Sequence, residues 1–403
     1  MLTFKYRVMN QKGQKIEGTF KANSKNEVLA MIEDNNYYPI EINEALEREQ
    51  KDLFESFAKV KTKDLYIFCR QFHTMINAGA NISNALNVLK KETENKKMKK
   101  CLNEVYEDVQ KGGSLSLALA KHKDVFPELL INMINTGEVS GNLDIIMGRM
   151  ASHYEKENKI NNQLKSAMVY PMVLAGLVVV VVIFLLTFIM PTFAGMFESS
   201  GVALPAPTRI VMGISKFIQT RWYILLIVIG GGVYGMKYYA KTPAGRLSID
   251  RLKFKLPIIK DTTEKVIVSR FTRTLSTVLV SGVPLVQCLE VVQKVVGNKV
   301  AEKSLGVIKE KVLKGVSLGE AIGDESIFPV MLHSMIKIGE ESGSLDDILD
   351  KTANFYDEEL ETSLKKMTTM LEPLMIIIMA VVIGFIVIAM MLPIFEMSKT
   401  VQQ

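Results

Sequence analysis

Residue types that could carry out chemistry are present, but their spacing forms no known catalytic or metal site. No HExxH, GxSxG or paired-carboxylate arrangement occurs, and the four histidines share no ligand spacing. Three cysteines, Cys69, Cys101 and Cys288, lie far apart, so we expect buried thiols in a reducing compartment. The sequence therefore predicts no catalytic residue, no cofactor and no metal ion.

A glycine-rich run at 230–237 superficially resembles a phosphate-binding loop. Met236 stands where the GxxxxGKS/T pattern requires lysine, and the run lies in an apolar segment. Close packing of helices through small residues is the expected role.

Two five-residue motifs hold a glutamate between glycines: Gly137-Glu138-Val139-Ser140-Gly141 and Gly339-Glu340-Glu341-Ser342-Gly343. Each is predicted to join two helices. The first glycine, Gly137 or Gly339, would end one helix, and Ser140 or Asn142, or Ser342 or Ser344, would cap the next. A sharper hypothesis makes both glutamates, with their flanking glycines, contacts for a partner. Metal binding is a weaker alternative, because Ca²⁺ takes about 6–8 oxygen ligands.

Three apolar segments, 168–190, 220–239 and 373–392, are long enough to cross a hydrocarbon core of about 30 Å. A buried core helix is the alternative for 220–239, whose apolar run is short. No segment has an ionisable residue in its middle, as ion pathways and proton relays require. These segments exclude a purely soluble enzyme, and their small number excludes a many-helix channel.

Charge gives the expected orientation of these spans. The net charge of +6 is spread along the chain, which does not suggest a nucleic-acid-binding protein. Basic residues precede the first span and follow the second, while the 191–221 segment and the tail after 392 hold few. The first residues lack the apolar region of a signal peptide. The N-terminus and 237–372 are therefore predicted to be cytoplasmic, and the 191–219 loop and the tail to face outward.

The chain contains an internal repeat, two copies of one sequence module. Phe68 aligns with Phe271 at an offset of 203, and from Phe126 and Phe328 onward the offset is 202. Apolar residues recur at helical spacing in both copies, which predicts two homologous antiparallel bundles of about six helices. Residues 1–50 alternate like strands around one helical stretch, which predicts a ββαβ module. The predicted fold class is a mainly α membrane protein with this domain order: module 1–50, bundle 54–167, span 168–190, outward loop 191–219, span 220–239, bundle 257–372, span 373–392 and outward tail 393–403.

Paired prolines mark both repeated spans: Pro171 and Pro191 in the first, Pro373 and Pro393 in the second. Each pair is 20 residues apart, or about 30 Å of helix. One interpretation is a helix start or kink that sets the tilt of the span. A compatible one is a joint that passes motion from bundle to membrane.

The stretch Gln163-Leu164-x-x-Ala167-Met168-x-Tyr170-Pro171 resembles the signature of the platform proteins of type II secretion and type IV pilus machines, the GspF/PilC family. The spacing of the residues that follow, up to Pro191, is similar too. With the duplicated bundles, the three spans and the N-terminal module, the resemblance covers nearly the whole chain.

This resemblance implies a non-enzymatic protein of the cytoplasmic (inner) membrane. Its implied partners are a cytoplasmic assembly ATPase, prepilin or pseudopilin subunits, other inner-membrane assembly proteins, the lipid bilayer and further copies of the chain; direct contact with nucleic acid is not implied. The alternatives are a small membrane carrier, which would need a polar residue within a span, and a membrane-anchored signalling scaffold.

Overall fold

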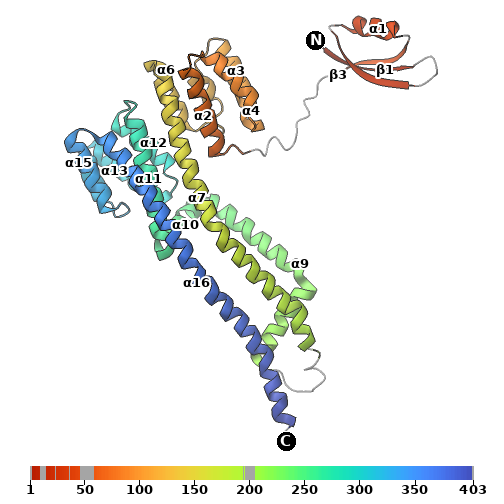
Figure 1. Ribbon diagram of the computed structural model, residues 1–403, viewed down its shortest axis with the longest axis vertical. Helices are drawn as coiled ribbons and strands as arrows, with labels where there is room; N and C mark the ends of the chain where they lie inside the picture. Colours follow the sequence, from red (N-terminus) through yellow and green to blue (C-terminus); the bar gives the residue numbers. More distant parts are fainter. Residues whose placement is uncertain are drawn as a thin grey trace. The chain divides into compact units, whose positions relative to one another are not determined.

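The computed structural model describes residues 2–9, 15–22, 24–35, 37–45, 59–193, 195 and 205–401 (Figure 1). Its internal contacts divide the chain into two units. One comprises residues 1–60 and 93–101, and the other comprises 61–92 and 102–403.

The N-terminal residues form the predicted ββαβ module. Strands β1 (Leu2–Met9), β2 (Lys15–Ala22) and β3 (Tyr38–Ala45) make an antiparallel sheet in the order β2-β1-β3, and helix α1 (Lys25–Asp34) lies between β2 and β3 in sequence. The alternation of the strands places Phe4 and Val8 on one face, where both are buried against Val28 and Ile32 of the helix. The module therefore has a small core of its own.

Each repeat supplies six helices of the described chain. The first has α2 (Thr62–Asn77), α3 (Ile82–Glu92), α4 (Lys96–Gln110), α5 (Leu115–Ala120), α6 (Glu128–Ser140) and α7 (Leu143–Phe184). The second has α11 (Pro257–Leu279), α12 (Leu285–Val295), α13 (Lys299–Leu313), α14 (Leu318–Gly323), α15 (Val330–Ser342) and α16 (Leu345–Val401). Helices α9 (Ala206–Lys241) and α10 (Pro243–Lys255) connect the repeats.

Equivalent residues make equivalent contacts in the two bundles. The rings of Phe68 and Phe126 are 5.5 Å apart, and those of Phe271 and Phe328 are 5.4 Å apart. His73 Nδ1 lies 2.8 Å from the carbonyl oxygen of Asp144, and its counterpart Ser276 donates to the carbonyl of Asp346 at 3.1 Å. The predicted fold class, two homologous helical bundles with three apolar helices, is confirmed.

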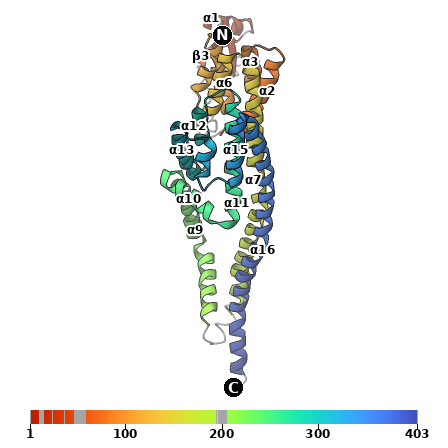
Figure 2. The same ribbon diagram turned by 90° about the vertical axis from the view of Figure 1, so that its left-hand side faces the viewer.

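Within the described residues, three helices are long and apolar enough to cross a membrane by length and composition: Leu143–Phe193, Ala206–Lys241 and Leu345–Phe395. In both repeats the last helix of the bundle continues directly into the apolar segment, as Figures 1 and 2 show for α7 and α16. The predicted boundaries at 167/168 and 372/373 thus fall inside helices. Pro171 and Pro373 are not helix starts, because the helix runs through both.

The segments predicted as an outward loop and tail are partly helical. Helix α9 begins at Ala206, within the predicted 191–219 loop, and α16 runs to Val401. One face of α9 buries Thr208, Val211 and Ser215. The charged residues Arg209 and Lys216 lie exposed on the other side of the helix, and they made this segment read as a polar loop in the sequence. The backbone of α9 leaves the helical region at Arg221 (φ −131°, ψ 29°), where the predicted 220–239 span begins.

The first glycine of the motifs 137–141 and 339–343, called GExxG motifs from here on, was expected to end a helix, and this expectation is wrong. Gly137 and Gly339 lie inside α6 and α15, and the helices end three residues later, before Gly141 and Gly343 in the left-handed conformation (φ 74° and 67°). Ser140 and Ser342 belong to the ending helices, and Asn142 is the N-cap residue of α7 without a side-chain cap bond.

Close helix packing explains the glycines at these two positions. A Cβ on Gly137 would lie 3.1 Å from the Cα of Leu143, and one on Gly339 would lie 3.0 Å from the Cα of Leu345. A side chain at either position would push the following long helix away.

Candidate functional site on the paired long helices

Helices α7 and α16 lie side by side where the bundles meet the apolar segments (Figures 1 and 2). Ile160 of α7 is buried there with Leu360, Leu364 and Met367 of α16. Leu164, from the stretch that carries the resemblance, packs against the same cluster. The signature therefore lies on the helix that contacts the second repeat.

Polar contacts continue this pairing toward the apolar segments. Gln163 donates to Glu361 at 3.1 Å, and the Tyr170 hydroxyl donates to Glu372 at 3.4 Å. Tyr170 and Glu372 occupy equivalent positions in the two repeats, each directly before a proline, Pro171 or Pro373. The structure thus brings together the two residues that directly precede Pro171 and Pro373. The sequence did not indicate this contact.

The outer prolines, Pro191 and Pro393, are accommodated differently in the two repeats. A π-helical segment, η2 (Leu185–Ile189), precedes Pro191, whereas Pro393 lies within α16. A π turn widens the helix and relieves the clash that a proline ring makes with the preceding turn. Pro191 and Pro393 lie far from the Tyr170–Glu372 contact along the helices, so the four prolines mark two separate levels.

A charged clamp joins the two bundles. The guanidinium of Arg270 on α11 donates to both carboxylate oxygens of Glu157 on α7, at 2.6 and 3.1 Å, and to Asn161 at 3.2 Å. The side chains of Arg270 and Glu157 are only 18% and 22% exposed. The repeat held a signal for this contact, because the counterpart of Arg270 in the first copy is Ile67.

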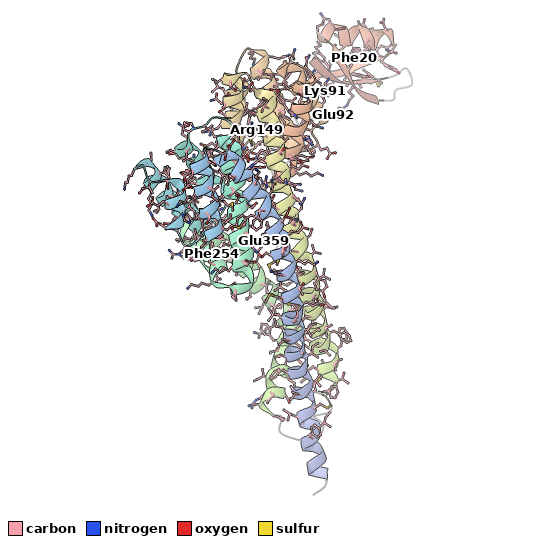
Figure 3. The ribbon with its side chains drawn as sticks, turned by 60° about the vertical axis from the view of Figure 1, so that its left-hand side comes forward. Phe20, Lys91, Glu92, Arg149, Phe254 and Glu359 are labelled. Carbon is pink, nitrogen blue, oxygen red and sulfur yellow. The ribbon has the colours of Figure 1, made fainter. Side chains whose placement is uncertain are left out.

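The carboxylate equivalent to Glu157 makes a matching contact within the second repeat. Glu359 on α16, labelled in Figure 3, pairs with Lys265 of α11 at 3.0 Å. Helix α11 therefore holds one long helix through Arg270 and the other through Lys265. This arrangement ties both long helices to the second bundle.

A second ion pair lies deeper in the seam between α11 and α16. Arg273 is buried and donates to Asp357 at 2.6 Å, and Ser269 donates to the other oxygen of that carboxylate at 2.6 Å. Arg273 also lines a pocket of 460 Å³ with Arg149 and His153. Burial, followed by the charges of Arg273 and Arg270, lowers the pKa of His153 to about 4, so this imidazole is neutral at pH 7.

Both glutamates of the GExxG motifs make internal contacts. Glu138 accepts backbone N–H bonds from Leu115 and Ser116, at 2.5 and 2.9 Å, at the start of α5. Glu340 does the same at the start of α14, accepting from Leu318 and Gly319. A carboxylate is favourable at a helix N-terminus, which presents unpaired N–H groups and a positive dipole end. Contact of these glutamates with a partner stays a prediction.

Metal and thiol chemistry find no assembled site in the part of the chain that the structure describes. No group of three or more His, Cys, Asp or Glu residues there could hold a metal ion. All three cysteines are buried, and burial raises the pKa of the Cys69 thiol well above its usual range and that of Cys288 to about 12. These two thiols are therefore protonated at neutral pH.

Comparison with known proteins agrees with the duplicated architecture. The family described as "Type II secretion system (T2SS), protein F" matches residues 68–191 and again 271–393, and its N-terminal domain matches residues 1–43. Type IV pilus assembly protein PilC of Thermus thermophilus is 36% identical over 99% of this chain and 99% of its own length.

Relatives named for type IV pilus assembly and relatives named for type II secretion both align along nearly their full length. PilC of Myxococcus xanthus is 31% identical over 99% of this chain and 96% of its own length, and type II secretion system protein F of Aeromonas hydrophila is 32% identical over 94% and 99%. The matches cover both bundles, the paired helices and the N-terminal module, which confirms the resemblance seen in the sequence. The chain therefore belongs to the type II secretion system protein F family, which includes type IV pilus assembly proteins.

Proposed function

We propose that this protein is the inner-membrane platform of a type IV pilus or type II secretion machine. It couples a cytoplasmic assembly ATPase to the insertion of pilin or pseudopilin subunits into a growing filament. The observation that carries the proposal is the continuity of α7 and α16, each of which is both the last helix of a bundle and an apolar span.

Continuity matters because a helix transmits displacement, whereas a loop absorbs it. The 42 residues of α7 rise about 60 Å, so a shift of the first bundle moves its apolar segment directly. The contacts of α7 with α16, including Tyr170 with Glu372, pass the same motion to the second span. Pro171 and Pro373 are the joints in this pathway, and Pro191 and Pro393 mark its far end. Gln163 and Leu164 of α7 contact α16 on the bundle side of these joints.

The proposed orientation assigns the partners to surfaces. The N-terminal module and both bundles face the cytoplasm and the ATPase, with the GExxG turns as contact candidates, and the C-terminus faces outward. Pilin subunits, other inner-membrane assembly proteins and further copies of the chain meet the spans. The apolar part of α9 after Arg221 is almost wholly exposed within the described chain, which leaves it open to lipid or to such helices.

A flexible insertion tests the coupling. Four residues, Gly-Ser-Gly-Ser, placed after Ala167 and again after Thr369 would separate each bundle from its span without changing either. We expect normal membrane insertion and normal co-purification with the ATPase, but loss of surface filaments or secretion at matched protein level. The same insertion after Gly201 is the control. Normal filament yield from the doubly interrupted protein would refute the proposal.

Two further experiments test the orientation and the joints. A topology reporter fused at Ser199 should report the outer side and one at Asn298 the cytoplasm; the same side for both would refute the orientation.

Pro171→Ala with Pro373→Ala should leave the protein inserted and abundant but reduce filament yield, because each joint becomes ordinary helix. Full yield would leave these prolines without a part in coupling.

A further inference from the structure

The first half of α9 presents two buried hydroxyls to the far ends of α7 and α16. Thr208 and Ser215 are 0% and 4% exposed, and Val211 between them is buried as well, so the three residues form one face. This face packs on a cluster that contains Leu186, Met190, Ile386, Ala389 and Met390. Figures 1 and 2 show α9 beside both long helices at this end.

Thr208 donates to a carbonyl that a proline leaves without its helical partner. In an α-helix the N–H of residue 393 would bond to the carbonyl of Ala389, but Pro393 has no N–H. The Thr208 hydroxyl donates to the carbonyl of Ala389, and both residues are 0% exposed. The hydroxyl thus replaces the missing backbone donor.

Ser215 donates in the same way to a carbonyl that Pro191 leaves without a partner in the first repeat. This carbonyl lies five residues before its proline, whereas that of Ala389 lies four residues before Pro393. In η2 the bonds run from residue i to i−5, and Met190 N–H bonds to Leu185 in this way. The next donor in that register would be residue 191, which is a proline, so the carbonyl of Leu186 loses its partner. Ser215 donates to that carbonyl, and Gln219 Nε2 lies 3.5 Å from it.

The alternative is that these hydroxyls merely follow the common habit of bonding to their own helix. Thr187, Thr192 and Thr220 do so here, each donating to the carbonyl four residues earlier. Thr208 and Ser215 instead donate across helices, and each meets a carbonyl that an outer proline, Pro393 or Pro191, has freed. Two matching coincidences in two repeats, from one face of one helix, argue against chance packing.

We propose that Thr208 and Ser215 are positioning residues that hold both long helices at their proline-marked ends. An unpaired carbonyl within hydrocarbon is unfavourable, and neighbouring hydroxyls or π turns are the means by which membrane helices accommodate proline. Moving α9 away would expose both freed carbonyls together. Helix α9 therefore fixes the spacing of the two spans at the end opposite the bundles.

A suppressor experiment on the purified full-length protein tests this inference, independently of any function in filament assembly. Thr208→Val removes the hydroxyl at nearly constant volume and should lower the thermal unfolding midpoint, whereas Thr208→Ser should restore it. Pro393→Ala supplies the missing N–H, so Thr208→Val should cost little in the Pro393→Ala background. Thr220→Val, whose hydroxyl bonds only within its own helix, is the matched control.

Two outcomes would overturn the inference. One is an equal loss from Thr208→Val in the presence and absence of Pro393, because a purely structural packing role does not depend on that proline. The other is a loss from Thr220→Val as large as that from Thr208→Val. Ser215→Ala combined with Pro191→Ala repeats the test at the second site, so an unstable Pro393→Ala variant does not prevent a decision.

Discussion

The clamp between Arg270 and Glu157 makes the sharpest energetic prediction. It is the bidentate ion pair through which helix α11 of the second bundle holds the long helix of the first repeat. A double-mutant cycle of Arg270→Met and Glu157→Gln isolates the interaction from the other effects of each substitution. We expect a coupling free energy of about 2 kcal/mol.

This magnitude follows from geometry and burial. Hydrogen bonds to charged groups contribute about 1.5–3 kcal/mol, and losing one partner of a fully buried pair costs about 3–5 kcal/mol. The Arg270–Glu157 pair is bidentate but about one-fifth exposed, so solvent screening reduces the value from that of a fully buried pair. Asn161 also remains available to either group in the single variants.

The measurement is equilibrium unfolding of the full-length protein in detergent, followed by circular dichroism. Lys294 and Glu128 provide a matched control, because they also join the two repeats but are 62% and 56% exposed. Their cycle should give a coupling free energy below about 1 kcal/mol. A coupling at Arg270–Glu157 no larger than at Lys294–Glu128 would refute the reasoning that burial makes this contact a clamp.

Three further predictions concern single residues. Gly137→Ala should lower the free energy of unfolding by about 1–3 kcal/mol, because its Cβ would press on Leu143. The Cβ of Gly176→Ala would meet nothing beyond its own helix within 4 Å in the described chain, so this change should leave the free energy of unfolding unchanged or raise it by up to about 1 kcal/mol. Equal effects of the two changes would contradict the packing argument. Glu340→Gln should lower the unfolding midpoint through loss of charge at the start of α14, whereas the exposed Glu341→Gln should not. In the unfolded state His153 takes up a proton as the pH drops below its ordinary pKa of 6.5, whereas in the folded state it does so only near pH 4. Protonation therefore favours the unfolded state, and the free energy of unfolding should fall as the pH is lowered from about 6.5 to 4. His153→Phe, which copies the second repeat, should flatten that fall, and an unchanged pH slope would argue against a neutral buried imidazole.

The sequence was informative wherever a pattern is local or repeated. Helical periodicity and the 202-residue offset predicted both bundles, and the uncharged runs predicted the three apolar helices. The same helical periodicity implies one apolar face on each helix, and Phe68 and Phe72 are buried on such a face of α2. These features follow from which side chains must leave water, so a single sequence carries them.

Contacts between distant residues were not predictable in the same way. A glycine that ends a helix and one that admits a neighbouring backbone look identical in sequence, so Gly137 received the wrong role. The capping of α5 by Glu138 joins residues 22–23 apart, and no local pattern announces it. Arg270 was the exception that the repeat could have revealed, since only one copy has a cation there.

The pairing of α7 with α16 also constrains how this chain can change in length. One residue inserted between Leu143 and Leu164 would turn everything beyond it by about 100° and advance it by about 1.5 Å. Tyr170 would then leave Glu372, Leu164 would rotate out of its cluster, and the carbonyl of Leu186 would turn away from Ser215. A requirement that both long helices keep the same length would explain why the offset between the repeats stays at 202 from Phe126 to Pro191. Insertions and deletions in either long helix are therefore tolerable only when the other helix changes by the same number of residues.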